Sequence, residues 1–259
     1  MTELALVVCL AAIALLERRR SLQVVAAPLL RPYTATDLTC LALTVFALGL
    51  AIRGLTLFFV AGLGVAIPRL PKLPAPWVLA GSFLTFDLGA YACHRLLHTS
   101  ERTWRFHRAH HSSPLLDWLA AYRAHGVEHA LRHLASPAFC LLLGFPTWAV
   151  AVASTIEAAW AAFNHANLDL DLGPLEKLFM TPSLHRIHHV PASSDRNFGA
   201  VLQVWDRLFG TFSDGRVAAT AVLGLGDQQD DYPQTWGAQL IEPWRSPSRA
   251  AREVRSAAA

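Results

Sequence analysis

Histidines dominate the stretch from His94 to His111, which reads HRLLHTSERTWRFHRAHH. They are spaced as HxxxH at its start and as HxxHH at its end, and they are His94, His98, His107, His110 and His111. The HxxHH spacing recurs downstream at His185, His188 and His189. Because residues three and four apart share a face of a helix, we expect each group to point two or three imidazoles in one direction. Converging imidazoles are typical of a transition-metal site.

The number of clustered histidines predicts more than one metal ion. A lone histidine is most often an ordinary surface or core residue. Three groups at this spacing, each near the junction of an apolar and a polar segment, favour a metal site instead. Their eight imidazoles exceed the four ligands of one tetrahedral ion. So many neutral ligands with few carboxylates, beside apolar segments, fit a di-iron centre that activates O2.

Two further histidines are candidates for this centre. His165, in FNHAN, directly follows an apolar segment and is expected to be another ligand. His125, in YRAHGVEH, is either a ligand or a residue that orients one. Carboxylates orient ligand imidazoles through the second ring nitrogen. The candidates for that role are Asp87, Glu128, Asp195 and Asp206.

Other metal-site classes fit the sequence less well. The zinc-protease motif HExxH is absent, and its inverted form HxxEH occurs once, at His125–His129. That match leaves the three larger groups unexplained. The four cysteines lie in apolar segments and form no CxxC pair, which argues against an iron–sulfur cluster, a thiolate zinc site and a disulfide framework.

Composition indicates an integral membrane protein. The 259 residues are 53% hydrophobic and only 16% charged, whereas soluble domains carry about 25% charged residues. The net charge of +3 suits contact with an anionic membrane surface and does not indicate nucleic-acid binding.

The apolar segments predict an all-α fold with about four membrane-embedded segments and a cytoplasmic helical cap that holds the metals. These segments are residues 2–16, 38–67, 77–93 and 134–163. Arg18, Arg19 and Arg20 follow the first segment and place its end in the cytoplasm. One metal centre needs all histidine groups on one side, so 134–163 is expected to be a hairpin that turns at Gly144–Pro146. The segment 38–67 either crosses once or is re-entrant.

Four motifs in a fixed order carry a family resemblance. HRLLH, HRAHH, HAN and HRIHH resemble the fatty acid hydroxylase and sterol desaturase superfamily of membrane di-iron oxygenases. The likeness includes Asp87 and Tyr91 before the first motif, NFG at 197–199 and WDRLFGT at 205–211. It covers about residues 80–212. The family usually has proline after the histidine at position 125, where this chain has Gly126.

The apolar segments and the resemblance together predict a domain order, and the resemblance implies a ligand set. Residues 1–76 would be N-terminal membrane helices and linker, 77–215 the fatty acid hydroxylase-like catalytic domain, and 216–259 a C-terminal tail. Two iron ions would be the cofactor and O2 the co-substrate. By motif position the ligands would be His94, His98, His107, His110, His111, His165, His185, His188 and His189, together with His125.

The implied reaction is hydroxylation of an unactivated C–H bond in a sterol, fatty acyl chain or other lipid, with desaturation as the alternative outcome. No haem-binding cytochrome b5-like domain, flavin motif or NAD motif is visible, so we expect electrons from a separate ferredoxin, cytochrome b5-like protein or flavin reductase. The implied location is the endoplasmic reticulum or the bacterial inner membrane, with the site facing the cytoplasm. A composition rich in Ala, Arg and Trp favours the bacterial membrane.

A competing class is a membrane protein that binds or transports metal ions. A transporter is expected to place ionisable groups within its spans, near the midplane. Here the histidines flank the apolar segments, and those segments carry few charges, namely Arg53, Asp87 and Glu157. This placement favours the oxygenase.

Overall fold

The computed structural model describes residues 2–22, 33–43 and 73–245. Most of the predicted segment 38–67 and the end of the C-terminal tail lie outside these residues. The described parts are helical, with only two isolated β-bridges, which confirms the all-α prediction for them. The helices are α1 (Thr2–Arg19), α2 (Thr34–Ala42), α4 (Ala75–Thr99), α5 (Glu101–His111), α6 (Gly126–Leu142), α7 (Thr147–His165), α8 (Pro182–His188), α9 (Val204–Phe209) and α10 (Trp236–Ile241).

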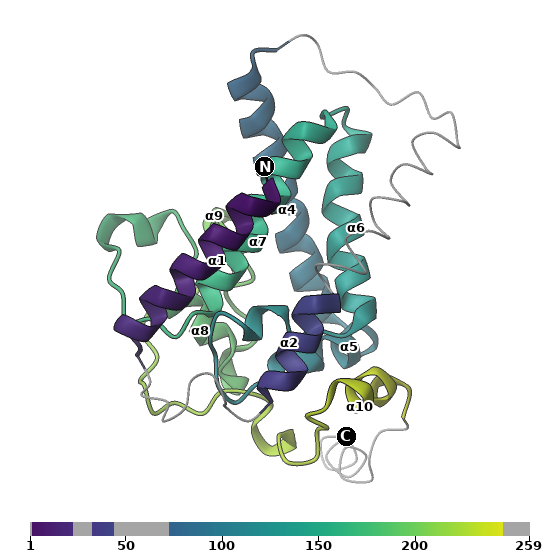
Figure 1. The fold of residues 1–259 in the computed structure, drawn as a ribbon, viewed down its shortest axis with the longest axis vertical. Helices are drawn as coiled ribbons and strands as arrows, with labels where there is room; N and C mark the ends of the chain where they lie inside the picture. The colour runs from purple at the N-terminus through teal and green to yellow at the C-terminus, as the bar shows by residue number, and fades with distance from the viewer. Residues whose placement is uncertain (1, 23–32, 44–72, 246–259) are drawn as a thin grey trace.

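Three long helices form the centre of the molecule. Helix α4 packs against both α6 and α7, and the three run side by side (Figure 1). Their shared core is the apolar cluster of Phe86, Cys140, Val150 and Ala153. The helices α4 and α6 cross closely at Gly89, where a Cβ atom would lie 3.3 Å from the Ser136 Cα. The tight crossing fixes the helix ends that carry histidines.

The connection between α6 and α7 is the predicted turn. Helix α6 ends at Leu142, and Gly144 adopts a left-handed conformation with a φ of 87°. Pro146 then precedes the first residue of α7. The turn predicted at Gly144–Pro146 is therefore confirmed, and it lets α7 return to the end of the bundle where α6 begins.

The stretch from His94 to His111 is helical with one break. Helix α4 continues to Thr99, and Ser100 leaves the helical conformation before α5 begins. The Ser100 hydroxyl accepts a hydrogen bond from the Arg102 backbone N–H at 3.2 Å and so caps α5. The break turns α5 against the end of α4, so that their histidines face one another.

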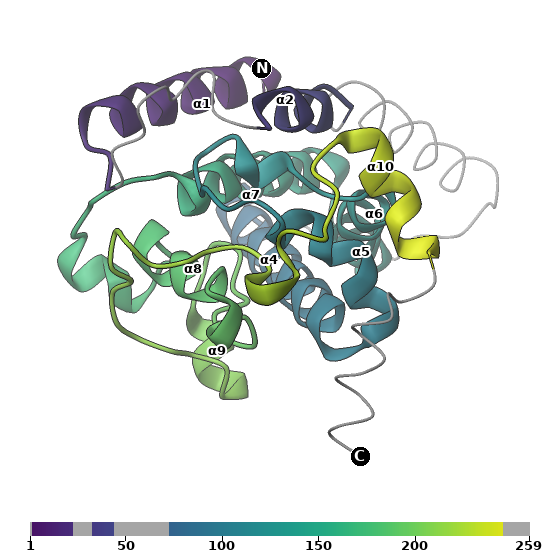
Figure 2. The same ribbon diagram turned by 90° about the horizontal axis from the view of Figure 1, so that it is seen from below.

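The remaining helices surround this bundle. Helix α1 packs along α7, on the side opposite α8 and α9 (Figure 2). Its Glu17 carboxylate accepts hydrogen bonds from the backbone N–H groups of Trp118 and Asn167. Helix α2 packs against α10, and the Gln229 side chain donates to the Ser112 carbonyl oxygen. The first part of the predicted tail 216–259 is thus folded onto the bundle.

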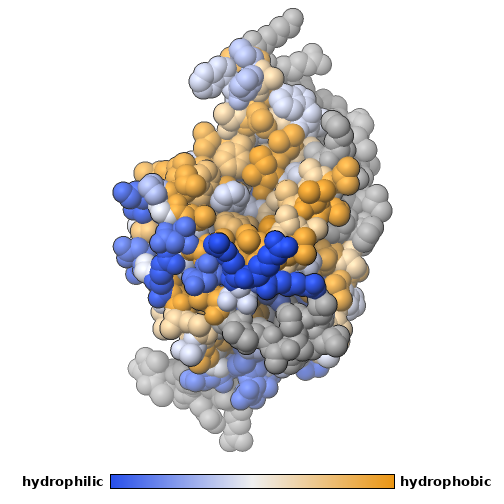
Figure 3. All heavy atoms as spheres, turned by 60° about the vertical axis from the view of Figure 1, so that its left-hand side comes forward, coloured by the Kyte–Doolittle hydropathy of each residue, from blue (hydrophilic) through white to orange (hydrophobic). Residues whose placement is uncertain are grey.

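Apolar side chains remain exposed on several helices. The exposed residues include Leu4 on α1, Trp77 at the start of α4, and Leu142 and Trp148 at the turn between α6 and α7. Figure 3 shows hydrophobic side chains gathered over the upper part of one face, with hydrophilic ones below them. Among the described helices, none combines the length and the apolar character needed to cross a membrane.

Candidate metal centre

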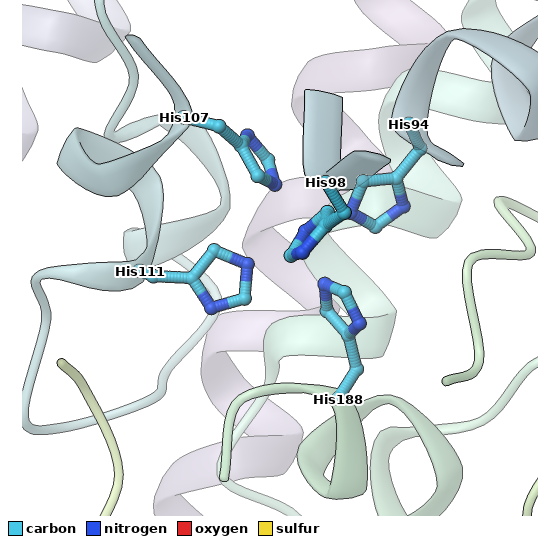
Figure 4. Close-up of side chains that lie close together, drawn as sticks. All are labelled: His94, His98, His107, His111 and His188. Atoms are coloured by element: carbon cyan, nitrogen blue, oxygen red, sulfur yellow. The ribbon is translucent and has the colours of Figure 1, made fainter. Parts of the chain in front are cut away.

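Nine of the ten predicted ligands lie together in two buried clusters. In each cluster one ring nitrogen from every histidine lies within 4.8 Å of the others. The five-histidine cluster (Figure 4) consists of His94, His98, His107, His111 and His188. The four-histidine cluster consists of His110, His165, His185 and His189.

The two HxxHH motifs are divided between the clusters. Helix α5 contributes His107 and His111 to the five-histidine cluster and His110 to the four-histidine cluster. In the motif at α8 the division is reversed. The middle histidine, His188, joins the five-histidine cluster, while His185 and His189 join the four-histidine cluster. Each motif therefore points two of its imidazoles the same way, as expected, and its third toward the other cluster. Residues four apart share a face, while the histidine between them turns toward the neighbouring cluster.

The five-histidine cluster has the donor set of a cation site. The Nε2 atoms of all five rings are buried and have no hydrogen-bond partner. Five unpaired nitrogens facing one another are costly, because buried polar atoms nearly always have a partner. A cation at their centre would supply it, and neutral imidazole suits iron.

The four-histidine cluster fits a metal ion by its spacing. The Nε2 atom of His165 lies 3.0 Å from Nε2 of His110 and 3.2 Å from Nε2 of His185. The Nε2 atom of His185 in turn lies 3.3 Å from Nε2 of His189. Ligand nitrogens held about 2.1 Å from one ion are separated by about 3.0–3.4 Å in octahedral or tetrahedral geometry. These contacts therefore match neighbouring vertices of a coordination polyhedron.

Backbone carbonyl groups orient four of the rings. The Nδ1 atom of His94 lies 2.9 Å from the Phe198 carbonyl oxygen, and that of His110 lies 3.0 Å from the Arg123 carbonyl oxygen. The Nδ1 atom of His188 lies 2.7 Å from the Arg196 carbonyl oxygen. The Nδ1 atom of His165 lies 2.7 Å from the Ala161 carbonyl oxygen. An Nδ1–H donated to a carbonyl leaves Nε2 as the ligand atom.

A carboxylate orients a fifth ring. The Nδ1 atom of His107 lies 2.8 Å from Oε1 of Glu128, and neither side chain is exposed. Burial raises the pKa of Glu128 to about 8, an effect opposed by the Arg132 guanidinium, which lies 3.6 Å away. With Nε2 bound to a cation, His107 would donate its Nδ1–H to this carboxylate. Glu128 thus takes the orienting role proposed for it from the sequence.

Two other predicted carboxylates act through a loop. Asp206 accepts hydrogen bonds from the backbone N–H groups of Phe198 and Gly199, at 2.8 and 2.7 Å. Asp87 accepts from the backbone of Val201 at 2.8 Å and from the indole of Trp205 at 2.8 Å. The two carboxylates fix residues 198–205 and, with them, the carbonyl that holds His94. By contrast, the Asp195 side chain is largely exposed.

Burial keeps the imidazoles neutral. It lowers the pKa of His107, His110 and His189 well below the usual 6.5, and neighbouring histidines add to the effect. For His188 burial lowers the pKa to about 4, although the hydrogen bond to the Arg196 carbonyl opposes this. A neutral imidazole has the free lone pair that a metal ion needs. The site is therefore ready to bind metal at neutral pH.

His125 lies outside both clusters. Its Nδ1 atom accepts a hydrogen bond from the Val127 backbone N–H at 3.0 Å and so caps α6. Its Nε2 atom lies 3.2 Å from the Leu240 carbonyl oxygen. Both nitrogens are therefore engaged with the backbone. Gly126, which replaces the family's usual proline, follows His125 as the first residue of α6.

Comparisons with known proteins agree with this site. The fatty acid hydroxylase family model matches residues 79–211, which include both clusters. The ornithine lipid hydroxylase OlsE of Rhizobium tropici is 32% identical over 63% of this chain and 49% of its own length. The alkylglycerol monooxygenase of Danio rerio is 35% identical over 53% of this chain and 30% of its own length. The alkylglycerol monooxygenase of Homo sapiens is 32% identical over 56% of this chain and 33% of its own length.

The chain thus spans about half or less of the length of these relatives. No solved structure matches it. The family match covers just over half of the chain and contains all nine clustered histidines. The chain belongs to the fatty acid hydroxylase family.

Proposed function

We propose that this protein is a di-iron oxidoreductase that uses O2 and two electrons to hydroxylate an unactivated C–H bond of a lipid. The observation that carries the proposal is the pair of adjoining buried clusters, with five and four converging imidazoles. The two clusters are in direct contact, because the imidazole rings of His111 and His189 are stacked with their centroids 4.5 Å apart. Two neighbouring metal ions suit a reaction that needs two electrons.

The chain would hold one iron ion in each cluster, and this pair would supply the O2 activation that the protein's own groups lack. The protein's part is to keep the ligands aimed and the site dry. Carbonyl groups and Glu128 hold the second nitrogens of the rings. Eight of the nine ligands are buried, and His98 is half-buried beside a surface groove that also contains Trp104. This groove is the open side of the five-histidine cluster.

We place the apolar ends of the helices in the membrane and the metal centre at its cytoplasmic side. The exposed apolar residues at the α6–α7 turn and at the start of α4 lie at the opposite end of the bundle from the clusters (Figure 1). Arg18, Arg19 and Arg20 are exposed at the other end of α1. Basic side chains of this kind favour the cytoplasmic face. Electrons would come from a separate ferredoxin, cytochrome b5-like protein or flavin reductase.

Hydroxylation is favoured over desaturation by the relatives. The matched proteins are named as a hydroxylase acting on ornithine lipid and as monooxygenases acting on alkylglycerols. Both names describe insertion of oxygen into a polar lipid. Ornithine lipids and alkylglycerols are therefore the first substrates to test, and an alkene product would identify the desaturase alternative.

The first experiment is metal analysis of detergent-purified protein produced under iron-replete anaerobic conditions. We expect about two irons per chain, and a marked loss of iron in His188→Ala, which removes one ligand of the five-histidine cluster. Purified protein, a reductase and O2 should then convert a lipid to its hydroxylated product. Tight zinc that iron does not replace, with no product, would contradict the oxygenase proposal and support a metal-binding role.

A further inference from the structure

A narrow cavity lies between α4, α6 and α7, next to both clusters. Its lining includes His94 from the five-histidine cluster and His110, His165 and His185 from the four-histidine cluster. Small residues such as Ala161 also line the cavity next to these histidines. The cavity has a volume of about 20 Å³, which is room for one or two water-sized groups. Only a small group at one point of a longer molecule would enter it, and that group would lie beside both proposed metal positions.

The cavity also has a polar wall. Arg132 of α6 and Glu157 of α7 line it and form an ion pair with an N–O distance of 3.4 Å. Asn164 also lines it and is only 2% exposed. The Asn164 Nδ2 atom donates to the Ala200 carbonyl oxygen at 2.6 Å, whereas its Oδ1 atom is buried without a hydrogen-bond partner.

A plain hydrocarbon chain is a poor occupant of such a cavity. It would leave the Asn164 oxygen unpaired and would press methylene groups against an ion pair, and both effects oppose binding. A group with an O–H or N–H hydrogen could donate to Asn164 Oδ1. Its own oxygen could accept a hydrogen bond from the Arg132 guanidinium, which has several donors.

We propose that Asn164, Arg132 and Glu157 form a substrate subsite for a polar group that carries a donatable hydrogen, either a hydroxyl or a secondary amide. This inference rests on the proposed function, because it assigns the cavity to the lipid substrate. The same cavity is lined by ligand histidines. The oxidised carbon is therefore a few bonds from the polar group and not at the far methyl end of the chain.

Matched ligands test the subsite without turnover. Iron-loaded, full-length protein is kept anaerobic without a reductant, and ligand affinity is measured by calorimetry. One arm compares hexadecan-1-ol with its methyl ether, and the other compares N-hexadecylacetamide with its N-methyl derivative. We expect the ligand with the donatable hydrogen to bind about tenfold more tightly in at least one arm, since the ether or tertiary amide leaves a buried acceptor unpaired. Equal affinities in both arms, or no binding, would overturn the proposal.

The Asn164→Leu variant assigns the preference to this residue. We expect the affinity for the preferred ligand to fall to that of its methylated analogue, while the analogue binds as before. Thr155→Val, on the same helix but outside the cavity lining, should keep the preference. Iron content and thermal stability check that Asn164→Leu is folded, and if it is not, the wild-type comparison alone decides. A folded Asn164→Leu protein that keeps the preference would overturn the proposal.

Turnover separates this inference from the proposed function. If the ligand preference holds but reductase and O2 give no oxidised lipid, the subsite stands and the hydroxylase proposal fails. If lipids are hydroxylated with no difference between donor-bearing and methylated analogues, the function stands and the subsite proposal fails.

Discussion

His107 and Glu128 form a fully buried hydrogen-bonded pair, with Nδ1 of the imidazole 2.8 Å from Oε1 of the carboxyl group. The two residues lie on α5 and α6, so the contact links the helix that carries three clustered histidines to the central bundle. Among the clustered histidines, His107 is the one whose Nδ1 has a carboxylate partner in the described structure. Glu128 therefore orients the His107 ring and would raise the basicity of its Nε2 atom toward a metal ion.

Glu128→Ala should weaken iron binding by about 10- to 100-fold, the usual effect of losing a carboxylate that orients a metal-bound histidine. Glu128→Gln should have a smaller effect because its amide oxygen can still accept from Nδ1. Chelator competition on purified protein measures both affinities. Asp171→Asn, which alters an exposed ion pair with Arg216, is the control and should bind iron as the wild type does. Unchanged affinity in Glu128→Ala would show that the pair does not support the metal site.

The helical positions of the ligands could be predicted from the sequence because helix periodicity is local. The spacings of the histidine groups and the Gly144–Pro146 signal depend on residues within a few positions of each other. These features placed the three histidine groups on helices and the α6–α7 turn at Gly144–Pro146 correctly.

The division of the ligands between the clusters could not be predicted in this way. It depends on how α5 and α8 face each other, and that is set by the break at Ser100 and by packing on α4 and α7. The carbonyl partners of His94 and His188 are backbone atoms, which carry no sequence signature. His125 matched a family position, yet its role in capping α6 depends on local backbone geometry.

Gly199→Ala should disrupt the loop that holds His94. A Cβ atom at position 199 would lie 2.7 Å from the Leu202 carbonyl oxygen and 2.9 Å from the Asp206 carboxylate. The backbone must then shift away from Asp206, and we expect a loss of about 1–3 kcal/mol of stability together with weaker iron binding. Thermal unfolding and iron content measure the two effects. Gly237→Ala, where a Cβ atom meets nothing within 4 Å, should leave both near wild-type values, and a similar result for Gly199→Ala would contradict the steric argument.

Asp37→Ala should destabilise the protein by about 3–5 kcal/mol, because it leaves a buried guanidinium without its charged partner. Arg123 Nε donates to Asp37 Oδ1, and neither side chain is exposed. The Arg123 carbonyl oxygen also accepts from His110, so we expect a parallel loss of iron affinity. Urea unfolding measures the stability. The double variant Asp37→Leu with Arg123→Met should be less destabilised than Asp37→Ala, and an equal or larger loss would argue that packing, not the unpaired charge, determines the effect.

Metal removal should lower stability, and more so in acid. A bound ion stabilises the folded state by about 2.7 kcal/mol when its free concentration is 100 times the dissociation constant, so chelation should lower the melting temperature and added Fe²⁺ should restore it. Removal of the metal also leaves buried neutral histidines whose pKa is lowered by burial, to about 4 for His188 and about 3 for His165.

In the unfolded chain these histidines take up protons near pH 6.5, while in the folded protein they stay neutral to lower pH. Acid therefore favours the unfolded state. Stability of the metal-free protein should be full above about pH 6.5 and fall steadily as the pH drops toward 4. Urea unfolding of chelator-treated protein between pH 8 and 4 measures this slope. A flat profile between pH 6.5 and 4 would mean that the metal-free clusters open and let their imidazoles titrate as freely as in the unfolded chain.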